Sequence, residues 1–504
     1  MTRTLTLCLA AVLLGASHQT PPTPAATLIR NALVIDGTGS PARRADVRIS
    51  GDRIVATGQL APAQGERVVD AGGLTLAPGF IDTHSHHDRG LDAAPDALAM
   101  VSQGVTTIVV GQDGGGSNLA ALFAGLESHP VAVNVASYAG HGAIRRRVLG
   151  QDFARHATAT EIDRMKALLQ GEMDAGALGL STGLEYDPGI YSAPDEVLAL
   201  AKVAADAGGR YISHIRSEDR WFWDALDELI AIGRVHKMPV QVSHIKLGMH
   251  DLWGQAEKLI GVLDRARATG VQVTADIYPY TYWQSNLGVL YPKRNFADAA
   301  ETEFVLAHVS LAEDIIFNSF RAHPEYVGKT LADVARMRAA TPAKTLMDLL
   351  AEPGGDGVGI VAKGMSDADV ERLLQWPFAN VCSDGQSSGL HPRGFGSFAK
   401  VLGPYVRDRK LFRVEEAVRK MSSLAAANVG IQNRGRIAPG YFADLVLFDP
   451  AVVADRADFG NAQRQAVGIR TVWVNGQVVF QDGETAGVHS GRPLRRVLTA
   501  ATTK

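Results

Sequence analysis

Gly79-Phe80-Ile81-Asp82-Thr83-His84-Ser85-His86 is the most informative segment of this chain. An apolar run follows a Pro-Gly turn and ends in two histidines two positions apart. On a strand, residues i and i+2 point to the same face, so both imidazoles can bind one metal ion at about 2.0–2.1 Å. Exposed or core histidines are the alternative interpretation, which the preceding turn and apolar run disfavour. His87 and Asp88 lie off that face or beyond the strand end.

Two more histidines end apolar runs, and both follow a serine. They are His214, after Tyr211-Ile212-Ser213, and His244, after Gln241-Val242-Ser243. Their separation is about the length of one strand-and-helix unit, which places them at the carboxyl ends of adjacent strands if the fold is a barrel. A lone histidine there is more often structural, but the repeated context predicts two further metal ligands.

Asp384 supplies a carboxylate at the end of another apolar run, Val381-Cys382-Ser383. By itself it is equally well a helix cap or a turn residue, but four histidines at similar positions favour a ligand that also accepts a proton from bound water. Histidine-rich ligation without paired thiols suits one or two Zn²⁺ ions, with Mn²⁺ or Fe²⁺ as alternatives. Such a metal lowers the pKa of bound water to about 7 and polarises a carbonyl. The glycine-rich residues 111–116 lack the lysine and the spacing of a phosphate-binding loop.

The middle of the chain alternates apolar, β-branched runs with amphipathic stretches of helical length. Continuous apolar runs are typical of buried parallel strands. The runs are residues 105–110, 131–135, 178–180, 210–213, 239–243, 271–276, 360–362 and 380–382, and the clearest helical stretches are 194–207 and 225–235. This pattern predicts an α/β fold, a (β/α)8 TIM barrel with insertions, and a doubly wound sheet is the alternative. Residues 282–329 interrupt the alternation and predict a long loop or small lid.

Both ends of the chain predict short strands separated by turns. At the start these are residues 28–35, 46–50 and 53–56, and at the far end 443–448, 470–474 and 477–480, the last two joined by Asn475-Gly476. Neither end alone makes a sheet with two faces, so we expect a small β-sandwich domain formed by both ends. The expected boundaries are 27–77 and 430–495 for the two sandwich parts and 78–429 for the barrel.

Residues 1–17 predict a cleaved signal peptide and hence a periplasmic or secreted protein. Arg3 precedes a ten-residue apolar run, too short to span a bilayer, and small residues follow it; an ordinary buried helix is the alternative. Cleavage removes Cys8, and Cys382 alone cannot form an intrachain disulfide, so stability would come from the core, the metal or a homo-oligomer. A net charge of −3 argues against nucleic acid or membrane partners and leaves a small-molecule substrate.

The sequence resembles the amidohydrolase superfamily and, within it, the D-aminoacylase (N-acyl-D-amino-acid deacylase) family. The resemblance covers nearly the whole chain after the signal peptide. Its segments are APGFIDTHSHHD, QGVTTIVVG, GALGLSTGLEYDPGIYS, SHIRSE, VSHIKLG, ADIYPY, SDG, HPRGFGSF and RGRIAPGYFADLVLFDP. It implies a barrel with a small β-sandwich and hydrolysis of an N-acyl-D-amino acid to a carboxylate and a D-amino acid.

The resemblance also implies how the metal ligands divide. His84, His86 and Asp384 match one metal position, with Asp384 as general base, and His214 and His244 match the second. The family usually has a cysteine where this chain has Asp113, within Val110-Gly111-Gln112-Asp113-Gly114. A carboxylate there can ligate or bridge, although it is harder than a thiolate, and a simple turn residue is the alternative.

Substrate contacts are implied by the same resemblance. Lys246 would bind the substrate carboxylate as a point charge alongside a tyrosine of Tyr278-Pro279-Tyr280, with Tyr280 preferred. Further implied contacts are Tyr191, Arg216, His391 and Arg393. Two other functions compete: a different amidase of the superfamily, such as a dipeptidase or cyclic-amide hydrolase, and a noncatalytic binding protein that retains the barrel.

Overall fold

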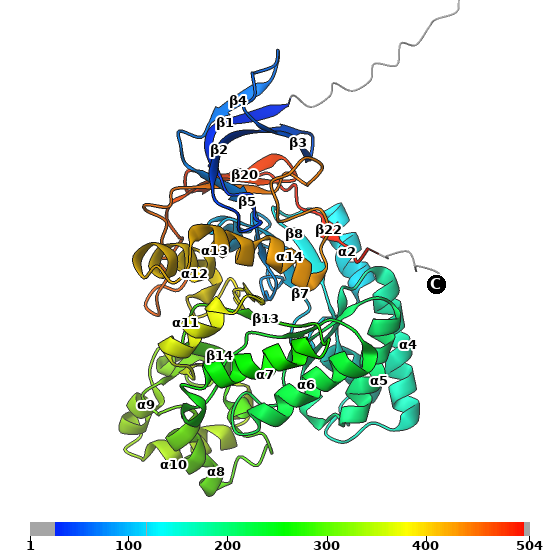
Figure 1. The fold of residues 1–504 in the computed structure, drawn as a ribbon. Helices are drawn as coiled ribbons and strands as arrows, with labels where there is room; N and C mark the ends of the chain where they lie inside the picture. Colours follow the sequence, from blue (N-terminus) through cyan, green and yellow to red (C-terminus); the bar gives the residue numbers. More distant parts are fainter. Residues whose placement is uncertain (1–25, 117, 498–504) are drawn as a thin grey trace, which may run out of the picture.

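The computed structural model describes residues 26–116 and 118–497 and has two parts, a barrel and a β-rich domain at one end of it (Figure 1). The predicted signal peptide lies outside the described residues.

Eight parallel strand positions form the barrel. In chain order they are β6 (Phe80–Asp82), β7 (Val105–Val110), β8 (Asn134–Ser137) continued by β9 (Ala139–Gly140), β10 (Gly179–Gly183), β11 (Arg210–His214), β12 (Val240–Val242), β13 (Val273–Ile277) and β17 (Ala379–Val381). A bridge between Ser85 and Gly385, just beyond β6 and β17, closes the ring. The strands are almost entirely buried, because helices cover their outer side. The predicted TIM barrel is confirmed.

Amphipathic helices surround the barrel. They are α1 (Leu98–Val101), α2 (Leu119–Ser128), α3 (His141–Leu149), α4 (Ala159–Ala175), α5 (Pro194–Asp206), α6 (Phe222–His236), α7 (Ala256–Ala268), α11 (Asp367–Gln375), α12 (Arg393–Lys400), α13 (Val414–Met421) and α14 (Ser423–Val429). Local sequence fixes several ends: Thr158 and Glu161 form a capping box at the start of α4, and Pro194 begins α5. In the described part of the chain, no helix is both long and apolar enough to cross a membrane.

The run at residues 360–362 was predicted as a barrel strand, and that prediction is wrong. It lies in β16 (Gly359–Lys363), which pairs antiparallel with β14 (Tyr282–Asn286) and β15 (Ile315–Ser319) in a separate sheet. An apolar run buried on both faces has the same periodicity in either setting, so sequence alone does not distinguish them. The eighth barrel position is β6, which lies in the apolar run of the segment 79–86.

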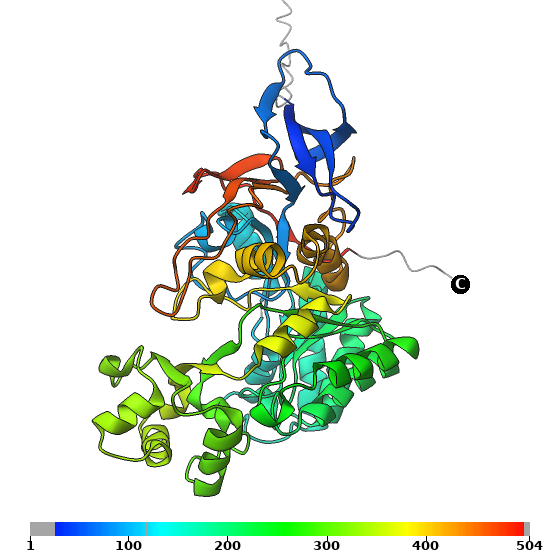
Figure 2. The same cartoon turned by 60° about the vertical axis from the view of Figure 1, so that its left-hand side comes forward.

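The stretch predicted as a long loop or lid is a folded insertion. Besides β14 and β15 it includes η3 (Leu287–Leu290) and α8 (Ala299–Phe304), and α9 (Leu331–Met337) and α10 (Pro342–Ala351) follow it. These helices group at the end of the barrel away from the β-rich domain (Figures 1 and 2).

The β-rich domain is built from both ends of the chain, as predicted. Within residues 26–497 its strands are β1 (Thr27–Val34), β2 (Arg43–Ser50), β3 (Arg53–Gly58), β4 (Arg67–Asp70), β5 (Thr75–Pro78), β18 (Leu445–Phe448), β19 (Ile469–Val474), β20 (Gln477–Gln481) and β21 (Glu484–Thr485). Antiparallel pairing of β5 with β18 joins the two ends, and N- and C-terminal strands lie side by side in Figure 2. One late strand, β22 (Pro493–Leu494), instead pairs with barrel strand β8.

A buried polar network attaches this domain to the barrel. The guanidinium of Arg434 pairs with Asp444 and donates to Asn475 Oδ1 at 2.9 Å. Asn475 Nδ2 in turn donates to Asn134 Oδ1, on β8, at 2.8 Å. The side chains of Arg434 and Asp444 are each 2% exposed. Each buried charge is therefore compensated by the other.

We expect Arg434→Met to lower the free energy of unfolding by about 3–5 kcal/mol, because it leaves the Asp444 carboxylate buried and unpaired. Denaturant titration measures the loss. The matched control is Arg470→Met, since the Arg470–Asp482 pair is more than half exposed on both sides, and it should change stability little. Equal effects of the two substitutions would contradict this role for the network.

Candidate metal centre

All six predicted metal ligands lie at the carboxyl ends of barrel strands. His214 is the last residue of β11. The other five follow their strands by a few residues: His84 and His86 after β6, Asp113 after β7, His244 after β12 and Asp384 after β17. His84 and His86 therefore lie beyond the strand rather than on it, yet their rings still meet at 5.4 Å between centroids.

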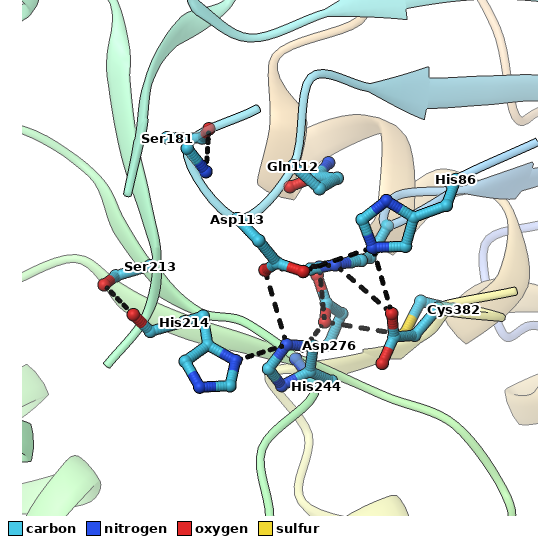
Figure 3. Close-up of polar contacts among 12 residues, drawn as sticks. His86, Gln112, Asp113, Ser181, Ser213, His214, His244, Asp276 and Cys382 are labelled. Atoms are coloured by element: carbon cyan, nitrogen blue, oxygen red, sulfur yellow. Dashed lines mark hydrogen bonds and ion pairs between the residues drawn. The ribbon is translucent and has the colours of Figure 1, made fainter. Parts of the chain in front are cut away.

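The ligand atoms of these residues converge (Figure 3). His86 Nε2 lies 3.1 Å from an Asp113 oxygen and 3.3 Å from Asp384 Oδ1. His84 Nε2 lies 3.4 Å from Asp113 Oδ1 and 3.6 Å from Asp384 Oδ1. His244 Nε2 is 3.4 Å from Asp113 Oδ1, and His214 Nδ1 is 3.1 Å from His244 Nε2. Four imidazoles and two carboxylates thus enclose one small volume.

Unpartnered polar atoms mark where a cation fits. Among the described residues, His84 Nδ1 and Nε2 and Asp113 Oδ1 are buried without a hydrogen-bond partner. Such atoms are costly unless something satisfies them. Donors at about 2.0–2.2 Å from one ion lie about 2.8–3.6 Å from each other in octahedral or tetrahedral geometry, which matches the separations observed. The residues present therefore fit a divalent metal.

Three ligands have left-handed backbone conformations, which are unusual outside glycine. The φ angles of Asp113, His244 and Asp384 are 53°, 34° and 47°. Neighbouring groups hold two of these conformations: Asp276 Oδ1 accepts from His244 N at 2.5 Å, and Asp384 N donates to His84 O at 2.8 Å. Strain of this kind concentrates at functional sites.

The pKa shifts at the centre keep its carboxylates negatively charged, which favours the binding of a cation. Burial raises the pKa of Asp384, but Arg393 and His244 outweigh it and hold that pKa well below its usual range. The Asp113 carboxyl behaves in the same way, its pKa lowered mainly by His84. Burial lowers the pKa of His86, but hydrogen bonds with Asp113 and Asp384 raise it to about 10. The carboxylates remain ionised and can bind a cation.

Carboxylates behind the ligands orient the histidines. Glu185 Oε2 accepts from His214 Nε2 at 2.8 Å, which turns His214 Nδ1 towards the centre. Asp276 Oδ1 lies 3.9 Å from His84 Nδ1, beyond hydrogen-bond distance, and holds the ligands through the backbone N–H of His244 instead. Carboxylate–histidine contacts of this kind fix the tautomer and ring orientation of metal ligands. Glu185 and Asp276 were not predicted, although they lie in the segments GALGLSTGLEYDPGIYS and ADIYPY, because their histidine partners lie on other strands.

Lys246 and Glu218 form an ion pair next to His244. Lys246 Nζ lies 2.6 and 2.8 Å from the Glu218 oxygens and 2.6 Å from His244 Nδ1. His214, Glu218 and His244 also lie within ligand distance of one another, but the Lys246 ammonium already takes the cation's place there. Glu218 was not predicted, although it lies in the segment SHIRSE.

The remaining predicted substrate contacts fall at different distances from the centre. Arg393 Nη1 lies 2.5 Å from Asp384 Oδ2, and His391 Nδ1 accepts from Arg393 N at 3.1 Å. The Tyr280 hydroxyl donates to Asp455 at 3.5 Å. Tyr278, the other tyrosine of that segment, has its ring 4.8 Å from the Arg393 guanidinium and a buried hydroxyl without a partner in the described chain.

The remaining two predicted substrate contacts, Arg216 and Tyr191, pack against residues other than the candidate metal ligands. Arg216 pairs with Glu228 and lines a separate groove between α5 and α6. Tyr191 packs its ring 6.0 Å from that of Phe153.

Two cavities adjoin the centre. A narrow one of about 50 Å³ lies on the side of His214, His244 and Lys246, and a larger one of about 380 Å³ lies on the side of His86, Asp113 and Arg393. The two cavities share four of their lining residues, which are Tyr186, Gln284, Ser285 and Asp384. A bound molecule can therefore extend to either side of Asp384.

Comparison with known proteins agrees with this geometry. The sequence model of the Amidohydrolase family matches residues 67–287 and 359–480. This chain belongs to the amidohydrolase family. Within it, the chain groups with D-aminoacylases: it is 36% identical to the D-aminoacylase of Alcaligenes xylosoxydans xylosoxydans, over 95% of this chain and 99% of that protein.

Two relatives that are named for a single N-acyl-D-amino acid are equally similar to this chain. The N-acyl-D-aspartate deacylase of the same organism is 36% identical, over 92% of this chain and 94% of that protein. The N-acyl-D-glutamate deacylase of Bordetella bronchiseptica, solved with zinc and a phosphonate inhibitor, has a TM-score of 0.84 and 36% identity, over 93% of this chain and 99% of that one. A solved D-aminoacylase with the same TM-score, 34% identity and the same coverage is described with a binuclear metal centre.

We expect Glu185→Gln to weaken metal affinity about 10–100-fold, because the amide orients the His214 ring less firmly than the carboxylate does. Competition with a chelator measures the affinity. The matched control is Glu228→Gln, which alters the Arg216 pair instead. Unchanged affinity in the Glu185 variant would show that His214 is oriented by other contacts.

Proposed function

We propose that this protein is a metal-dependent deacylase that hydrolyses N-acyl-D-amino acids to a carboxylate and a D-amino acid. The observation that carries the proposal is the convergence of His84, His86, His214, His244 and Asp384 around unpartnered buried atoms at the mouth of an amidohydrolase barrel. Zn²⁺ is the proposed metal, supported by the donor set and by the zinc in the N-acyl-D-glutamate deacylase structure.

The ligand set and Asp384 divide the work of amide hydrolysis. When bound, the metal lowers the pKa of a water molecule and polarises the substrate carbonyl. Asp384 Oδ1 faces the histidines while its Oδ2 is held by Arg393. Because Oδ1 has no arginine partner of its own and faces the candidate ligands, we assign it the role of accepting a proton from the attacking water. It then transfers this proton to the leaving amine.

Cationic groups next to the centre are suited to the substrate carboxylate. Arg393 and Lys246 line the two cavities on opposite sides of Asp384, and the unpartnered Tyr278 hydroxyl lies near Arg393. A guanidinium binds a carboxylate through two parallel hydrogen bonds, whereas Lys246 acts as a point charge.

The surroundings of Lys246 favour substrates with an uncharged side chain. Trp283, Val289, Leu290 and Val309 supply apolar walls to the narrow cavity, and Glu218 already neutralises Lys246. A second carboxylate placed there would face Glu185, Glu218 and Asp219. Like charges at such distances are unfavourable, so we propose neutral D-amino acids rather than D-glutamate or D-aspartate.

We expect Asp384→Asn to lower kcat by about 10²–10⁴-fold, since the amide accepts no proton from the attacking water. Steady-state kinetics measure the loss, and circular dichroism with thermal unfolding verifies the fold. Asp206→Asn, at an exposed surface pair with Lys202, is the control. An Asp384→Asn enzyme with wild-type kcat would remove Asp384 from the mechanism.

A substrate panel tests the substrate class. N-acetyl-D-leucine and N-acetyl-D-methionine should be hydrolysed with kcat/KM values above those of N-acetyl-D-glutamate and N-acetyl-D-aspartate, because of the acidic cavity wall. The corresponding L-isomers, dipeptides and cyclic amides should be poorer still. Faster turnover of a dipeptide or a cyclic amide would favour the rival amidase functions.

We also propose that the protein is exported to the periplasm or secreted. The support is the signal-peptide pattern of residues 1–17. The N-terminal mass of protein recovered outside the cytoplasm tests the cleavage.

A further inference from the structure

The larger of the two cavities next to Asp384 has a polar wall. Among the described residues that line it, none has an aliphatic side chain. The narrow cavity differs, because apolar side chains such as Trp283 and Leu290 line it. The two cavities therefore suit different halves of one substrate. Five residues of the larger cavity carry a side-chain amide, and these are Gln112, Gln284, Asn286, Asn318 and Gln386.

Some of these amide groups have a polar atom that is still unused. Gln112 Nε2 donates to Thr83 O at 2.8 Å and to Val109 O at 3.1 Å, which leaves Gln112 Oε1 buried without a partner in the described chain. Asn318 Oδ1 accepts from Leu390 N at 2.6 Å, and the Asn318 amide nitrogen makes no hydrogen bond within the described residues. An apolar acyl chain would remove water from such groups without replacing it, which is costly. A polar acyl group is the better occupant of this cavity.

Arg89 adds a positive charge to the same wall. A turn keeps it next to the candidate ligand His86, because Arg89 N donates to His86 O at 3.3 Å. Arg89 is exposed and lines the larger cavity, and its guanidinium has no ion pair or hydrogen bond in the described part of the chain. The other guanidinium of this cavity, that of Arg393, is already paired with Asp384. Arg89 is therefore available to an anionic group of the substrate.

The acidic groups of the larger cavity do not neutralise Arg89. Among the described residues that line it, only Asp113 and Asp384 are acidic, and both face His86 in the candidate metal centre. The narrow cavity has the opposite character, since three acidic residues line it besides Asp384. Opposite charges on the two sides of the centre orient a substrate whose acyl end carries a carboxylate.

We propose that the larger cavity binds the acyl group of the substrate, and that Arg89 selects a short acyl group that ends in a carboxylate, such as succinyl. The inference rests on the deacylase function proposed above and extends it to the acyl half of the substrate. In the reaction, the oxygen of water joins the acyl carbon as the C–N bond breaks. Both protons of that water end on the leaving amine, so the products are succinate and a free D-amino acid.

Two matched substrates test the acyl preference. N-succinyl-D-leucine and N-butyryl-D-leucine have acyl chains of the same length, and only the first ends in a carboxylate. We expect kcat/KM of the succinyl substrate to be about tenfold higher, since a guanidinium binds a carboxylate through charge-assisted hydrogen bonds. Arg89→Gln should abolish this ratio, whereas Arg89→Lys should retain part of it. The control is Arg321→Gln, because Arg321 is exposed on the insertion and lines neither cavity.

Inhibition by the acyl product gives a second measurement. Succinate should inhibit hydrolysis of N-acetyl-D-leucine more strongly than butyrate does. Higher ionic strength should narrow the difference, because Arg89 is exposed. In Arg89→Gln the two inhibition constants should become similar.

Equal kcat/KM values for the succinyl and butyryl substrates, or a ratio that Arg89→Gln leaves unchanged, would overturn the inference. Hydrolysis of N-acetyl-D-leucine in the same assay would still uphold the proposed function. If Arg89→Gln lowered kcat/KM for N-acetyl-D-glutamate and not for N-succinyl-D-leucine, the larger cavity would bind the amino-acid half, and the inference would be wrong. Failure to hydrolyse any N-acyl-D-amino acid would overturn both proposals. Since the wild-type ratio is itself decisive, the test does not depend on the folding of a variant.

Discussion

The structure depends on the mutual pairing of buried carboxylates and imidazoles at one mouth of the barrel. Carboxylates and imidazoles from five barrel strands meet at one mouth of the barrel, and most of them are buried. Burying a charge is costly unless it is paired. Here each carboxylate lies against histidines, and each histidine against a carboxylate. Removing one group would therefore leave its neighbours buried without a partner. Two of the unpartnered atoms, His84 Nε2 and Asp113 Oδ1, face the centre and are those that a metal ion would contact.

The barrel holds this cluster through a second set of buried groups. Asp82 Oδ1 accepts from Ser383 N at 2.8 Å, which ties the end of β6 to the segment that carries Asp384. Burial raises the pKa of Asp82 to about 6 despite these hydrogen bonds. Asp276 binds the backbone of His244, and Glu185 orients His214. Carboxylates thus have two roles in this chain. Some are candidate metal ligands at the mouth, and others bind the backbone or the side chains of those ligands.

The insertion after β13 converts the open mouth of the barrel into an enclosed site. Its strand β14 supplies Trp283, Gln284 and Ser285, and later residues of the insertion line both cavities next to Asp384. The match to the family covers residues up to 287 and resumes at 359, so it stops where much of this cover begins. The candidate metal ligands therefore lie on the barrel, whereas much of the cavity wall lies on the insertion.

The sequence by itself determined the class of fold and which residues meet at the candidate metal centre. Apolar runs ending in His84, His214, His244 or Asp384 are local signals, because a barrel places its chemistry where strands end. Tertiary structure decided the rest. The run at residues 360–362 has the pattern of a barrel strand but pairs in another sheet. Tyr278 rather than Tyr280 has the unpartnered hydroxyl near Arg393, and Glu185 and Asp276 gain their roles only from residues on other strands. Periodicity reports which side chains are buried, but contacts between residues distant in sequence are set by the packing of the whole chain.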